Sequence, residues 1–184
     1  MLALVYYCII LLWSVTILLY KRCDSYEVYN PSEVFSLGDS FRIKDEVEND
    51  IFIVKQQLLS IGKKLRIFDL AENELCYMEQ RLFKFMPEYD IYIAGRLVAN
   101  VKKKFAFFKN DFIITSPECQ YYVEGDIWAH EFQICRDGCA VAHISKAFFR
   151  LTDTYGVDID DSIDQLPVLA LAIVIDMVCH EKNH

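Results

Sequence analysis

A segment near the C-terminus is apolar on every side, and it constrains the fold of this chain more than any other feature. Residues 166–179 are hydrophobic or proline except for Asp176. A helix of this length is about 21 Å long, shorter than the roughly 30 Å hydrocarbon layer of a bilayer, so a membrane span is the less favoured interpretation. A helix that is apolar around its whole circumference is typical of a protein interior. We therefore expect the rest of the chain to wrap around it.

The residues before this segment predict where the helix begins. Ser162 and Gln165 have the spacing of a capping box, and Pro167 is tolerated in a first helical turn. Three acidic residues nearby suit the positive end of the helix dipole: Asp160, Asp161 and Asp164. With Asp158 they also resemble a calcium cluster, but the glycine and glutamate of an EF-hand loop are missing. The pattern thus favours a helix start over a cation site.

Short strands separated by turns precede the helix, and part of this pattern is repeated. Residues 35–45 can be laid on residues 59–69 at an offset of 24, with matches at Ser, Gly, Arg, Ile and Asp. Each copy predicts a β-hairpin, with turns at 45–49 and 69–73. Further turns are expected at 94–95, 116–117 and 136–138. About a dozen short antiparallel strands must close or stack to protect their edges. The predicted fold is mainly β, with one helix: a closed antiparallel barrel around the C-terminal helix.

The N-terminus carries a second apolar segment, of a different kind. Residues 2–20 contain no charge and are long enough to span a bilayer, and Lys21 and Arg22 follow directly. The positive-inside tendency would leave the following domain on the cytoplasmic side of a single-pass membrane protein. A cleaved signal peptide is one alternative, and another is a misassigned start, with a cytoplasmic protein beginning near Ser25. We expect an anchor over 1–22, a linker over 23–33 and one domain over 34–184.

Charge and cysteine content narrow the functional classes. The chain has 19 basic and 27 acidic residues, so its net charge of −8 argues against nucleic acid as a partner. Its seven cysteines are an odd number without the spacing of a disulfide framework, as expected for free thiols in a reducing compartment. No phosphate loop or nucleophile elbow is present, and we expect neither an enzyme nor a cofactor.

One group of residues has the chemistry of zinc ligands. His130, Cys135, Cys139 and His143 are spaced as H-x4-C-x3-C-x3-H across one predicted hairpin. This spacing is not that of a common zinc finger, and His130 shares strand parity with apolar residues. We therefore expect no metal, and zinc is kept as the alternative.

Several stretches together resemble the LURP-one-related family of the tubby-like superfamily. The similarity runs from about residue 34 to residue 180. The matching stretches are FSLGD at 35–39, YDIYIAG at 89–95, KKKF at 102–105, VEGD at 123–126, VAHISK at 141–146, DTYGVDI at 153–159 and LALAIVID at 169–176. The resemblance implies a twelve-stranded β-barrel around a C-terminal hydrophobic helix. It implies no settled activity: tubby domains bind phosphoinositides and the related phospholipid scramblases act at membranes.

Clusters of basic residues are the candidate binding sites. The candidates are Lys102, Lys103, Lys104 and Lys109, with Lys63, Lys64 and Arg66 as a second group. Lysines held beside a bilayer attract anionic headgroups by about 1 kcal/mol each. The expected function is therefore non-enzymatic binding of phospholipid or phosphoinositide headgroups by a membrane-tethered domain. The alternative is an adaptor whose domain binds a protein partner, with lipid serving only as anchor; the sequence leaves the oligomeric state open.

Overall fold

The computed structural model describes residues 23–29, 40–57, 59–104, 112–127, 129, 131–145 and 154–180. These residues form β-strands and one α-helix. Every pair of neighbouring strands is antiparallel. The strands are β1 (Cys23–Tyr29), β2 (Ser40–Lys44), β3 (Asp50–Gln56), β4 (Lys64–Phe68), β5 (Glu74–Gln80), β6 (Glu88–Ile93), β7 (Arg96–Lys103), β8 (Phe112–Thr115), β9 (Gln120–Asp126), β10 (Glu131–Arg136), β11 (Cys139–Ser145) and β12 (Thr154–Asp160), and the helix is α2 (Gln165–His180).

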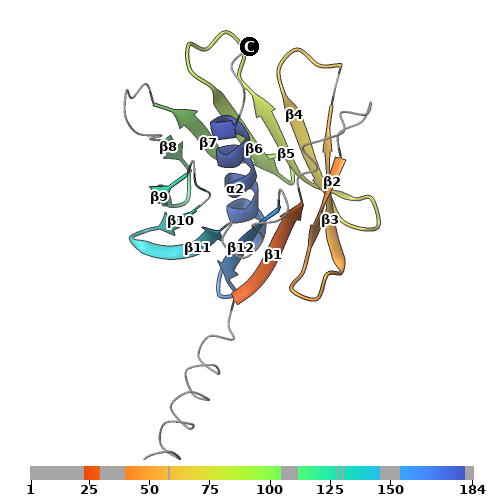
Figure 1. The fold of residues 1–184 in the computed structure, drawn as a ribbon. Helices are drawn as coiled ribbons and strands as arrows, with labels where there is room; N and C mark the ends of the chain where they lie inside the picture. Colours follow the sequence, from red (N-terminus) through yellow and green to blue (C-terminus); the bar gives the residue numbers. More distant parts are fainter. Residues whose placement is uncertain are drawn as a thin grey trace, which may run out of the picture.

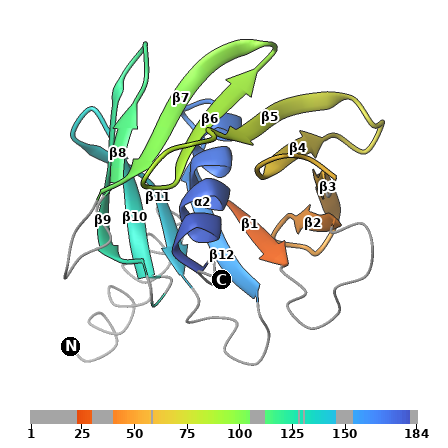
Figure 2. The same ribbon diagram turned by 90° about the horizontal axis from the view of Figure 1, so that it is seen from above.

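The strands follow one another around the helix. From β2 to β12 each strand pairs with its neighbours in sequence, and β1 pairs with both β12 and β2, so the strand order returns to its start. Two seams are short, because β1 meets β2 and β8 meets β9 through only two residue pairs each. Figures 1 and 2 show the strands arranged around α2.

The helix α2 supplies the middle of the core, as its sequence predicts. Its residues from Val168 to Ile175 are buried, and they pack with inward-facing strand residues such as Ile43, Ile67 and Ile91. Burying a side chain of this size stabilises the fold by about 1.5–3 kcal/mol. The predicted class, mainly antiparallel β with a C-terminal helix, is confirmed. Among the described residues no helix is both long and apolar enough to cross a membrane, and the predicted N-terminal anchor lies outside those residues.

The start of α2 differs in detail from the sequence prediction. The helix begins at Gln165, and the Leu166 amide donates to Oδ1 of Asp164 over 3.2 Å, so Asp164 is the cap rather than Ser162. The Ser162 amide instead donates to Oδ1 of Asp160, which holds the preceding turn. Pro167 occupies the first helical turn, where its missing N–H costs no hydrogen bond.

The predicted linker over 23–33 is wrong in its first part. Cys23–Tyr29 form β1, which pairs along its whole length with β12. The acidic residues and Pro31 in this stretch suggested a linker. The deciding factor is the backbone: β12 offers hydrogen-bonding groups on its free side that need a partner strand. The strands around α2 therefore include Cys23–Tyr29, which precede the predicted domain start at Val34.

The two repeated hairpins have the same turn geometry. Oδ1 of Asp45 accepts a hydrogen bond from the Asn49 amide, and Oδ1 of Asp69 accepts the equivalent bond from Asn73, both over 2.8 Å. A β-bulge follows the buried Ile43 in one hairpin and Ile67 in the other. A third bulge at Ile91 continues the spacing of 24 residues. The internal repeat predicted from the sequence is thus a structural repeat.

We define the two ends of the domain by its connections. The turn end carries the tight hairpin turns at 45–49, 69–73, 94–95 and 137–138, together with the first residue of β1 and the start of α2. The loop end carries the β3–β4 and β5–β6 connections and the C-terminal turn of α2. In Figure 1 the turn end faces down and the loop end faces up. Strands of seven residues separate the two ends by about 20 Å.

Removing a turn aspartate is expected to destabilise its hairpin at neutral pH. Hydrogen bonds from the Asn73 side chain and backbone lower the pKa of Asp69 below its ordinary value of 3.8. A lowered pKa stabilises the folded state above about pH 4, and this stabilisation is lost as the pH falls through the folded-state pKa. Asp69→Ala should lower the urea midpoint at pH 7, with the difference from wild type shrinking below pH 4.

The matched control is Glu118→Ala in the exposed β8–β9 turn, which should leave the midpoint nearly unchanged. An equal loss of stability at pH 7 and pH 3 for Asp69→Ala would contradict the proposed role of the carboxylate.

Candidate functional site at the loop end

The loop end brings together several of the predicted basic residues. Lys102 and Lys104 are exposed at the end of β7, and Lys63 and Lys64 lie half-buried at the start of β4. Lys84, which the sequence analysis did not single out, is exposed in the β5–β6 connection between these two groups. Lys109 lies outside the described residues.

Lys103 does not belong to this basic surface. It alternates with Ala99 and Val101, whose side chains are buried in the core, and it is itself half-buried. Burial raises the pKa of Cys179 to about 11, while nearby Lys103 acts to lower it. Lys103 therefore lies close to the last turn of α2, where a cation is favoured by the helix dipole. Headgroup binding by Lys103 stays a prediction, and its position differs from that of the exposed Lys102 and Lys104.

Arg66 is also engaged within the protein. Its Nε atom lies 3.0 Å from Oε2 of Glu74, and its guanidinium carbon lies 4.8 Å from the centre of the Tyr77 ring. The Tyr77 ring in turn stacks on Tyr92, with ring centres 5.9 Å apart. Ion pairing and cation–π contact both favour the observed arginine position. Nη1 of Arg66 also donates to Oε1 of Gln57 over 3.0 Å, so Arg66 is held by three partners within the protein.

A shallow cavity lies on the outer surface of β5 and β6 near the turn end. Its volume is about 430 Å³, and its lining includes Tyr77, Glu79, Tyr92 and Gly95. The Tyr77 hydroxyl donates to Oε2 of Glu79 over 2.8 Å. Burial, followed by this hydrogen bond, raises the pKa of Tyr77 to about 12, so the phenol stays protonated at neutral pH. The cavity offers aromatic faces and carboxylates, which suit a polar or cationic group.

Carboxylates separate the two groups of lysines on the sheet surface. Lys64 is registered with Glu79, which is registered with Asp90, and Asp90 is registered with Asn100 on β7. Lys102 stands opposite Glu88. The lysines therefore form no continuous basic stripe across the strands, and they approach each other only around the loop end.

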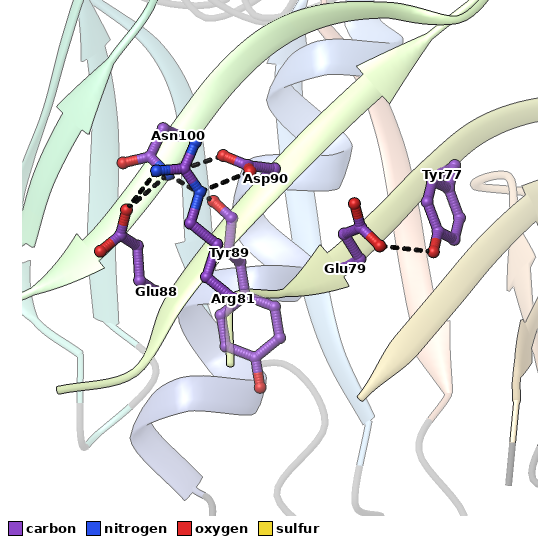
Figure 3. A network of polar contacts seen from close by, with 7 residues as sticks. All are labelled: Tyr77, Glu79, Arg81, Glu88, Tyr89, Asp90 and Asn100. Atoms are coloured by element: carbon purple, nitrogen blue, oxygen red, sulfur yellow. Dashed lines mark hydrogen bonds and ion pairs between the residues drawn. The ribbon is translucent and has the colours of Figure 1, made fainter. Parts of the chain in front are cut away.

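Glu88 and Asp90 are buried although they point away from the core, and one arginine accounts for this (Figure 3). Arg81 donates from Nε to Oδ2 of Asp90 over 2.6 Å and from Nη1 to Oε1 of Glu88 over 2.9 Å. Asn100 donates to Oδ1 of Asp90 over 2.7 Å and to Oε1 of Glu88 over 3.2 Å. Because Arg81 is the first residue of the β5–β6 connection, this network fixes the base of that loop.

Large apolar side chains project from the same end, and the sequence analysis missed them. Leu59 and Phe83 are fully exposed, and Ile61 and Phe85 are 80% and 88% exposed. They belong to the β3–β4 and β5–β6 connections. The signal that was available is the occurrence of Leu, Ile and Phe within segments rich in Gly, Ser, Lys and Pro, where turns are normally polar.

The thiols and histidines were the other predicted candidates. Burial raises the pKa of Cys76 to about 12 and also raises that of Cys135, which keeps both thiols protonated. Within the described part of the chain, no three His, Cys, Asp or Glu side chains are placed to hold a metal ion. His130 lies outside that part, so the four-residue zinc pattern as a whole stays a prediction.

The sequence of this chain is similar to those of known proteins. The family model described as LURP-one-related matches residues 28–176, which include most of the strands and all but the last turn of α2. The chain belongs to the LURP-one-related family. This confirms the resemblance seen in the sequence. The uncharacterized protein YxjI of Bacillus subtilis is 33% identical over 157 residues, covering 85% of this chain and 96% of that protein.

A solved structure supports the same fold. The X-ray structure of a protein from Arabidopsis thaliana is similar with a TM-score of 0.62, over 85% of this chain and 91% of that one. Sequence identity between the two is 16%, so the likeness concerns the fold alone. The fold of this family member is thus similar to a tubby-like fold.

The polar network of Figure 3 predicts a strong effect of one nearly isosteric change. Asn100→Asp replaces a donor with a third carboxylate beside Glu88 and Asp90. The lost charged hydrogen bonds and the added repulsion should lower the free energy of unfolding by about 1.5–3 kcal/mol at pH 7. The new carboxyl should have a raised pKa in the folded state, so the loss should fade below about pH 4, as urea unfolding at both pH values would show.

Gln133→Glu is the matched control, because Gln133 donates to Glu124 on the exposed surface of β10 and β9 over 3.1 Å. It should change the unfolding free energy by about 0.5 kcal/mol or less. Equal effects of the two substitutions would show that burial of the Arg81 network has no energetic consequence.

Proposed function

We propose that this domain binds anionic lipid headgroups at a membrane surface through its loop end and carries out no chemical reaction. The family match supports the domain type, and the proposal for lipid rests on the distribution of charge. Lys63, Lys64, Lys84, Lys102 and Lys104 all lie at the loop end. Membrane tethering by residues 1–22 stays a prediction.

The separation of charge between the two ends is the observation that carries this proposal. Acidic residues outnumber basic ones at the turn end. The loop end holds the five lysines at the start of β4, at the end of β7 and in the β5–β6 connection, and its carboxylates Glu124, Asp126 and Glu131 lie apart from them on β9 and β10. The acidic residues of the turn end are Asp45, Glu46, Glu48, Asp50, Asp69, Glu72, Glu74, Asp137, Asp160, Asp161 and Asp164. A domain with this distribution turns its lysines toward an anionic surface, even though the whole chain has a net charge of −8.

The point where the chain enters the domain changes one part of the expected mechanism. Cys23 pairs with Asp160 at the turn end, about 20 Å from the lysines. An anchor directly before Cys23 would therefore not by itself hold the lysines against the same bilayer. Headgroup binding and tethering are for this reason separate proposals with separate tests.

Replacing loop-end lysines should weaken vesicle binding. A fragment of residues 23–184 contains all the described strands and α2, and its folding is checked first by cooperative urea unfolding. Lys102→Ser with Lys104→Ser removes about 2 kcal/mol of attraction, or roughly thirtyfold in affinity at low salt. Co-flotation with phosphatidylserine, phosphoinositide and neutral vesicles measures this loss.

Wild-type binding should be restricted to anionic vesicles and should weaken from low to physiological salt. Lys44→Ser at the turn end is the matched control and should bind as wild type does. Equal flotation with neutral and anionic vesicles, or equal loss in the control, would refute headgroup recognition by the loop end.

A protein partner is the second candidate, and the cavity on β5 and β6 favours it. Tyr77, Tyr92 and Glu79 present stacked rings and a carboxylate on an accessible face of the sheet. These groups suit a basic side chain of a partner rather than an anionic headgroup. Tyr92→Ser should leave vesicle binding unchanged under the first proposal and should abolish partner capture under the second.

A further inference from the structure

The exposed apolar side chains of the loop end lie in two adjacent loops. Leu59 and Ile61 lie in the β3–β4 connection, and Phe83 and Phe85 lie in the β5–β6 connection. The two connections touch: a side chain at Gly62 would come within 2.7 Å of Cδ2 of Leu82. Single exposed apolar residues are common on protein surfaces, but a contiguous group of large ones marks an interaction site.

These loops are held in place by the protein itself. The Ser60 hydroxyl contacts the carbonyl oxygens of Gln57 at 3.0 Å and Gly62 at 2.7 Å. The base of the second loop is closed by hydrogen bonds from the Arg81 amide to the Glu88 carbonyl and from the Lys103 amide to the Pro87 carbonyl. The apolar side chains are therefore presented on fixed loops and do not collapse onto the core.

The backbone conformation of Phe83 also holds its side chain in solvent. Its φ angle is +59°, in the left-handed region that residues with a side chain rarely adopt. The loop thus places a large ring in solvent at a position where glycine or asparagine would be easier to accommodate. Lys84 lies between Phe83 and Phe85 in the sequence, so apolar and basic groups alternate at the tip of the loop.

The charge around the apolar side chains identifies the partner. The lysines that border them are Lys63, Lys64, Lys84, Lys102 and Lys104, whereas the carboxylates of Glu88 and Asp90 are buried under Arg81. An apolar group bordered by cations complements an anionic bilayer, whose headgroups are negative and whose acyl region is apolar. Four or five lysines alone give only weak attachment, and apolar insertion would supply the missing affinity.

We propose that Leu59, Ile61, Phe83 and Phe85 insert into the interfacial region of an anionic bilayer while the surrounding lysines contact its headgroups. This inference rests on the proposed headgroup binding. It adds which side chains enter the bilayer and how deep they reach. The occupant is the lipid bilayer; a second copy of the chain or another protein is tested against it below.

The experiment measures the depth of one loop in the fragment of residues 23–184, whose folding is verified first by cooperative urea unfolding. Residues 1–22 are left out so that they cannot fix which end of the domain faces the vesicle. Phe83→Trp is made in a background where Trp128 is replaced by Phe, and the fragment is mixed with phosphatidylserine-containing vesicles that carry brominated acyl chains. Emission from the introduced tryptophan should shift to the blue and be quenched by bromine. Leu70→Trp at the exposed turn end is the matched control and should be neither shifted nor quenched.

Side-chain removal gives an independent measure. Phe83→Ser with Phe85→Ser should reduce affinity for anionic vesicles by roughly tenfold or more, because apolar area no longer leaves water. Leu70→Ser removes an exposed apolar side chain from the other end and should have no effect. Both sites are on the surface, and circular dichroism and urea unfolding verify that each variant is folded.

The outcomes separate this inference from the proposed function. Salt-sensitive binding of the Phe83→Trp variant to anionic vesicles without quenching of its fluorescence overturns insertion and leaves headgroup binding intact. Loss of binding to every vesicle overturns both. A dimer of the wild type that disappears in the Phe83→Ser, Phe85→Ser variant, measured by light scattering without lipid, overturns the bilayer as occupant and assigns the surface to a second copy.

Discussion

The burial of α2 is the constraint on which the rest of this structure depends. A helix without a polar face cannot lie on the surface, and it is too short to leave the domain for a bilayer. Strands paired on both sides solve this problem, because they surround the helix and satisfy their own backbone hydrogen bonds at the same time. The inward-facing residues of the strands need only be apolar and of suitable volume. Packing around the helix places no such requirement on the outward-facing residues of the strands.

The character of the outer surface differs between the two ends of the strands. The turn end holds tight, acidic hairpin turns with repeated geometry, whereas the loop end holds longer connections with lysines and large apolar side chains. The Arg81 network belongs to the loop end, where it anchors the β5–β6 connection to the buried carboxylates of β6. The same strands that enclose the core thus set the positions of the residues that we propose contact lipid.

Periodicity made the fold predictable, whereas the site depends on contacts between distant residues. The hairpin turns at 45–49 and 69–73 follow from local alternation and from Asp and Asn at fixed spacing, and the structure confirms them. Features that depend on tertiary contacts could not be predicted in this way. Pairing with β12 turns the expected linker into β1, and strand parity turns Lys103 inward. A run of three lysines does not indicate which of them faces the core. A single phenylalanine such as Phe83 does not indicate whether its side chain is buried or exposed.

The alternation of connections between two ends has a consequence for variation within the family. Each hairpin turn fixes the register of its two strands, so an insertion there would shift apolar residues out of the core. The β3–β4 and β5–β6 connections join strands whose register is already fixed by other contacts. Changes in their length or composition therefore leave the core in place. The loop end can thus vary in sequence while the turn end preserves the fold, as variable loops do on the constant framework of many binding proteins.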